Sequence, residues 1–207
     1  MLLTEEIETA ITPENKIGEG RYRAVYRIGN RAVKIIKPFI RKYYGLFSIN
    51  YSISLYTQLK FGINDFNEYE FKKYLELNEK IPAEFRDNFL HIFGTEKNNG
   101  NSISLCELIL DSDGKISMPL DRETINSDFW NRLDRLEEFL LDSEIYFMDI
   151  RPENILAREL NGSFIPVIID YKKIDRQTYP FQIWLKFRSQ IENKFRRRFQ
   201  RLKELNK

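Results

Sequence analysis

Three side chains in the second half of the chain have the types and the order that phosphoryl transfer requires. Asp149 and Asn154 lie in the run Phe-Met-Asp-Ile-Arg-Pro-Glu-Asn-Ile, and Asp170 follows in Val-Ile-Ile-Asp-Tyr. The reaction needs a carboxylate at the acceptor hydroxyl, an amide oxygen on a metal ion and a second carboxylate on that metal. These three residues can fill those roles in that order. The apolar runs between them predict short strands that would aim the groups, and a surface turn before a buried strand is the alternative.

Two glycines and a lysine near the start of the chain predict a nucleotide-binding hairpin. Gly18 and Gly20 lie in Ile-Gly-Glu-Gly-Arg-Tyr-Arg, where the missing Cβ atoms let the backbone approach phosphate oxygens. A Gly-Asn pair then predicts a tight turn into a second strand, which carries Lys34 among apolar neighbours. A lysine in such a strand is costly to bury unless anions pair with it. Phosphates and one glutamate would be such anions, and a hairpin without a ligand is the alternative.

Hydrophobic periodicity and turn residues predict the elements that would position these groups. They are a strand-rich start over residues 1–37, a helix capped by Asp65 and Asn67, strands at 92–95 and 102–110 joined by the turn-rich 96–101, a linker at 111–114, and a helix opened by Asn126 or Ser127. The aromatic segment 38–63 shows no clear periodicity and is expected to be a packing insertion.

The last predicted element is an amphipathic helix from Pro180 to about Leu205. Its apolar face includes Trp184 and Phe187, and its other faces are nearly all basic. A charge run on a helix is usually a solvated face, but one of a single sign also fits an anionic partner. Lipid headgroups or a phosphorylated glycan are the partners we expect. Nucleic acid is the weaker alternative, because the whole chain has a net charge of only +2.

The order of these motifs resembles the protein-kinase-like fold, and more narrowly the PhoP regulatory network proteins of the YrbL type. The residues that carry the resemblance are 18–23, 111–115, 151–156 and 165–170, together with the tail helix. The resemblance implies an α+β, two-lobed, minimal kinase-like fold. A small β-rich N-lobe with one main helix would span residues 1–110, and a reduced, mostly helical C-lobe would span 111–207.

The same resemblance implies ATP and Mg²⁺ as cofactors and assigns roles to individual residues. The nucleotide-binding residues would be Gly18, Gly20, Val25, Lys34, Glu70, Glu107 and Ile109, the last two through their backbone beside adenine. The catalytic residues would be Asp149, Arg151 and Asn154, and the metal ligands Asn154 and Asp170. Glu70 is the glutamate expected to pair with Lys34, and Glu68 is the alternative.

Several departures from the kinase pattern bear on the substrate. Arg23 stands where a third glycine is usual, Arg151 stands in place of a lysine, and Tyr171-Lys172 replaces Phe-Gly after Asp170. No Ala-Pro-Glu sequence follows Asp170, so a peptide substrate docked in the usual way is not expected. A small-molecule or glycan hydroxyl fits better, and the compact lipopolysaccharide sugar kinases are a second resemblance. A pseudokinase that acts as a regulator or scaffold is the alternative to an active phosphotransferase.

Composition agrees with a folded protein. A chain of 207 residues can bury roughly 70% of its unfolded surface. Cys106 is the only cysteine, which excludes an internal disulfide and fits a reducing compartment. The start of the chain lacks the features of an export signal, and no apolar stretch is long enough for a membrane span. We expect a cytoplasmic protein, with peripheral binding at the inner face of the membrane as an open alternative.

Overall fold

The computed structural model describes residues 7, 9–20, 23–36, 65–98, 101–120, 125–171 and 188–204. The aromatic segment 38–63, Lys172, Trp184 and Phe187 lie outside these residues. The chain divides into two compact units. The first comprises Met1–Lys72 and His91–Leu108, and the second comprises Lys73–Leu90 and Ile109–Lys207.

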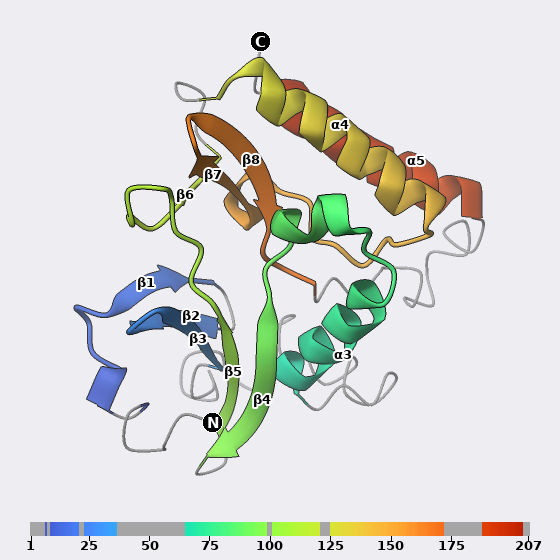
Figure 1. Cartoon of the computed structure of the whole chain (residues 1–207). Coiled ribbons are helices and arrows are strands. Elements are labelled where there is room, and N and C mark those ends of the chain that lie inside the picture. Colours follow the sequence, from blue (N-terminus) through green and yellow to red (C-terminus); the bar gives the residue numbers. More distant parts are fainter. Residues whose placement is uncertain are drawn as a thin grey trace. The chain divides into compact units, whose positions relative to one another are not determined.

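The first unit contains a five-stranded antiparallel sheet (Figure 1). Its strands are β1 (Lys16–Glu19), β2 (Arg23–Ile28), β3 (Arg31–Ile36), β4 (Ile92–Asn98) and β5 (Asn101–Glu107). They lie in the order β1-β2-β3-β5-β4, so that β3 pairs with β5 across a long stretch of sequence. The turn between β2 and β3 contains Gly29 at φ 55°, a conformation that favours glycine.

Alternation along these strands gives the sheet two different faces. Val33 and Ile103 are buried on one face, where they form a small apolar core with Ile7. Lys34 lies on the other face, opposite Val25 on β2 and Ser104 on β5 in the register of the sheet. Because successive side chains of a strand point to opposite faces, the lysine is directed away from that apolar core.

Helix α3 (Phe66–Asn78) follows β3 in the described chain and begins in the first unit. The Asp65 carboxylate accepts hydrogen bonds from the backbone N–H groups of Asn67, at 2.8 Å, and Glu68, at 3.2 Å. Asp65 therefore caps the helix, whereas Asn67 lies within its first turn. Of the two residues predicted to cap this helix, only Asp65 uses its side chain to do so.

The second unit combines a small antiparallel sheet with helices. Its elements are the 3₁₀ helix Ala83–Asn88, β6 (Met118–Pro119), α4 (Ser127–Asp142), the 3₁₀ helix Pro152–Asn154, β7 (Ile155–Leu160), β8 (Ser163–Ile168) and α5 (Arg188–Glu204). The strands lie in the order β6-β7-β8. The tight β7–β8 hairpin brings the residue before β7, Asn154, beside the segment that leaves β8: the Ile169 N–H donates to the Asn154 carbonyl at 3.1 Å.

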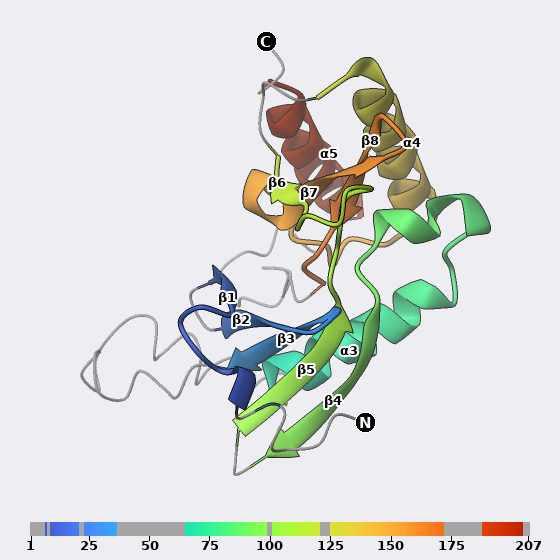
Figure 2. The same ribbon diagram turned by 60° about the vertical axis from the view of Figure 1, so that its left-hand side comes forward.

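Helices α4 and α5 lie side by side in this unit (Figures 1 and 2). The Asn126 side chain caps α4 by accepting from the N–H of Phe129, and the apolar face of α4 is buried. Helix α5 buries Phe195, Phe199 and Leu202. Lys203 of α5 pairs with Glu137 of α4 at 2.7 Å, so an ion pair joins the two helices.

The α+β class predicted from the sequence is confirmed, with an antiparallel sheet in the N-terminal part and the long helices α4 and α5 later in the chain. The strands predicted at 92–95 and 102–110 differ in extent from β4 and β5. Pairing between them continues through Asn98 and Asn101 into the segment predicted to be a turn, and β5 ends at Glu107. None of the helices among the described residues is long and apolar enough to cross a membrane.

Candidate functional site

Lys34 and Glu70 form a buried ion pair in the first unit. The Lys34 Nζ atom lies 3.0 Å from Oε1 and 3.2 Å from Oε2 of Glu70. The Lys34 side chain is 8% exposed, and that of Glu70 is fully buried. The partner of Lys34 is therefore Glu70, while Glu68 lies on the exposed side of α3 and pairs with Lys97 at 2.9 Å.

A second cation, Arg23, binds the same carboxylate. Its Nη1 atom donates to Glu70 Oε2, and its Nη2 atom donates to Oε1 at 3.3 Å. Arg23 is only 5% exposed, so two buried cations share the Glu70 carboxylate. A guanidinium that donates through both nitrogens fixes the orientation of a carboxylate, because the two planar groups match in geometry.

Asn67 connects this ion-pair group to the sheet. Its side-chain oxygen accepts from Arg23 Nη1 at 3.1 Å, and its Nδ2 donates to the carbonyls of Lys34 and Ser102 at 3.2 and 3.0 Å. Asn67 is fully buried. The first turn of α3 is therefore bound to β2, β3 and β5 through a single amide side chain.

The thiol of Cys106 lies on β5, one strand away from Lys34. Burial raises the pKa of this thiol above its ordinary value, and the Lys34 charge opposes the effect. The side chain is completely buried, and its sulfur lies 3.5 Å from Oγ of Ser104. Cys106 is therefore a neutral packing residue on the face of the sheet that carries Lys34.

Gly18 and Gly20 lie at the end of β1, as the hairpin interpretation requires. Gly18 is opposite Val25 on β2, and the Gly20 N–H donates to the carbonyl of Arg23 at 2.8 Å. Neither glycine adopts a positive φ, and a Cβ at Gly18 would make only ordinary contacts with Val25. What these glycines contribute is the absence of a side chain rather than an unusual backbone conformation.

The structure brings Asp149, Asn154 and Asp170 together in the second unit. The Asp149 N–H donates to the carbonyl of Asp170 at 3.2 Å. Asn154 donates through Nδ2 to the Asp149 carbonyl at 3.0 Å and to its Oδ2 at 3.1 Å. The Asp170 side chain is buried, with the residue 7% exposed. Backbone and side-chain hydrogen bonds thus hold the three residues in one group.

Two arginines flank the Asp149 carboxylate. Arg151 Nε lies 3.4 Å from Oδ1, and Arg198 Nη1, on α5, lies 3.7 Å from the same oxygen. Burial lowers the pKa of Arg198, and the neighbouring charge of Asp149 opposes the effect. The sequence places Arg198 on the basic face of this helix and does not predict its contact with Asp149.

Tyr171, the residue after Asp170, is fully buried. Its hydroxyl lies 2.7 Å from the carbonyl of Leu90 and 3.0 Å from that of Ile168. Its ring stacks on Tyr74, with the ring centroids 6.0 Å apart. These contacts fix the backbone immediately after Asp170.

The two backbone positions predicted to lie beside adenine, Glu107 and Ile109, belong to different units. The Glu107 N–H donates to the carbonyl of His91 at 2.9 Å in the first unit. The Ile109 carbonyl accepts from the N–H of Ser117 at 3.0 Å in the second. At both positions one backbone group is therefore already used within the protein.

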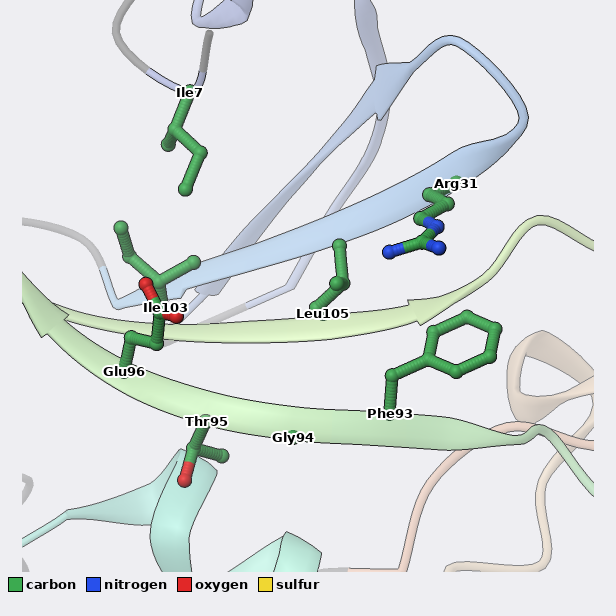
Figure 3. Close-up of a pocket in the computed structure, with 8 residues that line it drawn as sticks. All are labelled: Ile7, Arg31, Phe93, Gly94, Thr95, Glu96, Ile103 and Leu105. Carbon is green, nitrogen blue, oxygen red and sulfur yellow. The ribbon is translucent and has the colours of Figure 1, made fainter. Parts of the chain in front are cut away.

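A pocket of about 320 Å³ lies over strands β3, β4 and β5 of the first unit (Figure 3). Phe93 and Arg31 stand at one end, with the guanidinium 4.9 Å from the ring centroid, and Glu96 stands toward the other end. None of the residues predicted to bind nucleotide lines this pocket. It provides no polar group that the phosphoryl-transfer interpretation uses.

The contacts of Arg23 and Asn67 in the ion-pair group and of Arg198 with Asp149 were not predicted from the sequence. A signal for Arg23 was present, since it lies two residues before Val25 and strand alternation puts both on one face. No local signal could have placed Arg198 next to Asp149, because that contact depends on how α5 packs.

Within the described ranges, no group of three or more His, Cys, Asp or Glu side chains could hold a metal ion. Asn154 and Asp170 remain the metal ligands that the sequence predicts.

The five-stranded sheet of the first unit and the small sheet and helices of the second define an α+β protein. More specifically, the chain belongs to the family described as PhoP regulatory network protein YrbL, which it matches over residues 10–205. A search among curated proteins finds no significant match.

Two of the similar solved structures are kinase domains. The similar structures include Rad53 residues 1–466 in complex with AMP-PNP (16% identity, TM-score 0.46), the PknI kinase domain of Mycobacterium tuberculosis (9%, 0.43) and the BubR1 kinase domain (19%, 0.43). The matches cover 77%, 78% and 81% of this chain, but only 38%, 60% and 48% of those structures.

Proposed function

We propose that the protein is an ATP-dependent phosphotransferase that acts on a hydroxyl group. The observation that carries the proposal is the hydrogen-bonded group of Asp149, Asn154 and Asp170. Phosphoryl transfer uses these three side-chain types in this order along the chain, and catalysis then consists mainly of positioning and electrostatic stabilisation.

In this proposal Lys34 binds the α- and β-phosphate oxygens of ATP. Glu70 orients the lysine, since its carboxylate contacts Nζ through both oxygens. Gly18 and Gly20 cover the phosphates with backbone alone. Val25 contacts the base, and the backbone at Glu107 and Ile109 binds adenine.

Asn154 and Asp170 have the ligand chemistry that Mg²⁺ prefers, an amide oxygen and a carboxylate. The Nδ2 atom of Asn154 faces Asp149, so its Oδ1 points away from that hydrogen bond. Two protein ligands are enough, because Mg²⁺ usually keeps several waters and binds nucleotide phosphates as well. When bound, the ion neutralises charge on the transferring phosphoryl group.

Asp149 accepts the proton of the acceptor hydroxyl, and Arg151 neutralises charge on the γ-phosphoryl group. The Arg151 side chain is 59% exposed, which leaves it able to turn toward a ligand. We propose a small-molecule or glycan acceptor, because the sequence after Asp170 has no Ala-Pro-Glu. A cytoplasmic location, with access to the inner face of the membrane, completes the proposal.

The proposal is tested by comparing the parent protein with Asp149→Ala. Mg-ATP affinity is measured by calorimetry, and slow ATP hydrolysis by phosphate release. We expect normal affinity and loss of turnover by about 100-fold or more in the variant, in line with the usual contribution of a general base. Equal turnover of parent and variant would contradict the proposal.

The ion pairs of Asp149 favour a second candidate function. The Asp149 carboxylate is already engaged by Arg151 and Arg198. This arrangement fits a pseudokinase regulator or scaffold, with the exposed Arg196 and Arg201 of α5 binding an anionic partner such as a lipid headgroup or a phosphorylated glycan. Mg-ATP binding without turnover, in the parent and in Asp149→Ala alike, would support this candidate.

A further inference from the structure

The basic residues of α5 do not form one uniform surface. Arg196, Arg197 and Arg201 are exposed, whereas the Arg198 side chain is only 21% exposed. It extends toward the Asp149 carboxylate of the same unit. Arg198 therefore differs from its neighbours on the helix in burial and in its charged partner.

The contact between Arg198 and Asp149 is an ion pair rather than a hydrogen bond. At 3.7 Å, the separation of Nη1 and Oδ1 exceeds the usual range of 2.7–3.2 Å for N–H···O bonds. The Nη1 atom is itself buried and donates no hydrogen bond to any described residue. Burying a charged donor without a hydrogen bond costs the free energy of removing it from water. An oxyanion that accepts a hydrogen bond from Nη1 would recover part of that free energy.

Arg151 adds a second guanidinium at the same place. Its Nε atom lies 3.4 Å from the oxygen that Arg198 approaches, and its side chain is largely exposed. Two guanidiniums converge on one carboxylate oxygen, while Asn154 binds the other oxygen. Guanidinium groups match phosphate and carboxylate oxygens in planar, paired hydrogen bonds. The neighbouring charges of Arg151 and Arg201, which help to lower the pKa of Arg198, also favour an additional anion.

We propose that Arg198 and Arg151 form a phosphate-binding subsite next to Asp149. A phosphate group there competes with the Asp149 carboxylate for the two guanidiniums and leaves that carboxylate able to accept a proton. The phosphate can belong to the acceptor molecule, which would then be a phosphorylated compound, or it can be the γ-phosphate of the nucleotide. Both sources supply the same chemistry. Assigning the subsite to an acceptor or a nucleotide rests on the proposed function, whereas the subsite itself does not.

The test is a calorimetric titration of the full chain with inorganic phosphate at constant ionic strength. The variants are Arg198→Gln and the matched control Arg197→Gln, which removes the same charge from an exposed position one residue away. We expect Arg197→Gln to bind phosphate like the parent and Arg198→Gln to bind it at least tenfold more weakly. No phosphate binding by the parent, or equal weakening in both variants, would overturn the proposal.

Two further arms complete the experiment. Arg151→Gln removes the exposed member of the pair and is expected to weaken phosphate binding as well, so the test does not depend on the folding of Arg198→Gln alone. Unchanged affinity in Arg151→Gln would count against the proposal.

A repeat with saturating Mg-AMP-PNP separates the two sources of phosphate. Persistent phosphate binding assigns the subsite to an acceptor, and competition assigns it to the γ-phosphate. A parent that binds phosphate but not Mg-AMP-PNP would refute the proposed function and leave the subsite standing.

Discussion

Arg23 binds the same Glu70 carboxylate that pairs with Lys34, with its Nη2 atom 3.3 Å from Oε1. The position of Arg23 is the one where the kinase pattern has its third glycine. In this chain that position, at the start of β2, therefore contributes a buried cation to the lysine–glutamate pair. The stability of the first unit should depend on how these three charges are balanced.

Glu70→Gln should be among the most destabilising single substitutions in the protein. It would leave Lys34 and Arg23 buried without their shared carboxylate, and breaking a buried ion pair costs about 3–5 kcal/mol. The exposed control Glu68→Gln should change the free energy of unfolding by less than about 1 kcal/mol. Denaturant titration measures both, and equal effects of the two substitutions would contradict this account.

Arg23→Gln should cost less than Glu70→Gln. Glu70 keeps Lys34 as a partner when the guanidinium is removed, so the expected loss is about 1–3 kcal/mol from hydrogen bonds to Glu70 and Asn67. Arg27→Gln is the control, because the Arg27 side chain is exposed and bonds the nearby Gly29 carbonyl. If the denaturation midpoint moved no further for Arg23→Gln than for Arg27→Gln, the role given to Arg23 would be wrong.

The Cys106 thiol should resist modification in the folded protein. Complete burial excludes reagents, and burial raises the pKa of the thiol, so little thiolate forms at pH 8. Labelling with a disulfide reagent should be slow in buffer and fast after denaturation. Full labelling of the native protein within seconds would show that β5 is far more accessible than the structure implies.

Tyr171→Phe should destabilise the second unit by about 1–3 kcal/mol, because the buried carbonyls of Leu90 and Ile168 lose the hydroxyl that bonds them. Tyr146→Phe is a suitable control, since its hydroxyl bonds Glu192 at a half-buried position. Its expected effect is below about 1 kcal/mol. Thermal unfolding of the two variants checks the difference, and a larger effect at Tyr146 would argue against a tightly held Tyr171.

The local elements of the fold could be predicted because each has a strong local signal. The Gly-Asn turn after Ile28 and the cap at Asn126 are examples, and both lie where the sequence indicated. The short strands β7 and β8 lie where the apolar runs between Asp149 and Asp170 predict them, although their pairing as a hairpin was not predicted. Such features depend on the backbone preferences of a few neighbouring residues, and the residue types at those positions predict them.

The contacts between distant residues were harder to predict. The extension of β4 and β5 toward residues 98 and 101 depends on pairing across a sheet, which overrides the turn preference of the local asparagines. The contacts of Arg23 with Glu70 and of Arg198 with Asp149 join residues far apart in the chain. These contacts depend on how the elements pack, so the sequence predicts which residue types are present but not which of them meet.

Nucleotide binding is the central claim, and a thermal-shift titration tests it most directly. The parent protein, Lys34→Ala and Asp170→Ala are titrated with ATP, with and without Mg²⁺. Because a ligand that binds only the folded state raises the melting temperature, we expect a Mg²⁺-dependent rise in the parent that both variants lose. No rise in the parent under any condition, or an equal rise in all three proteins, would contradict the account.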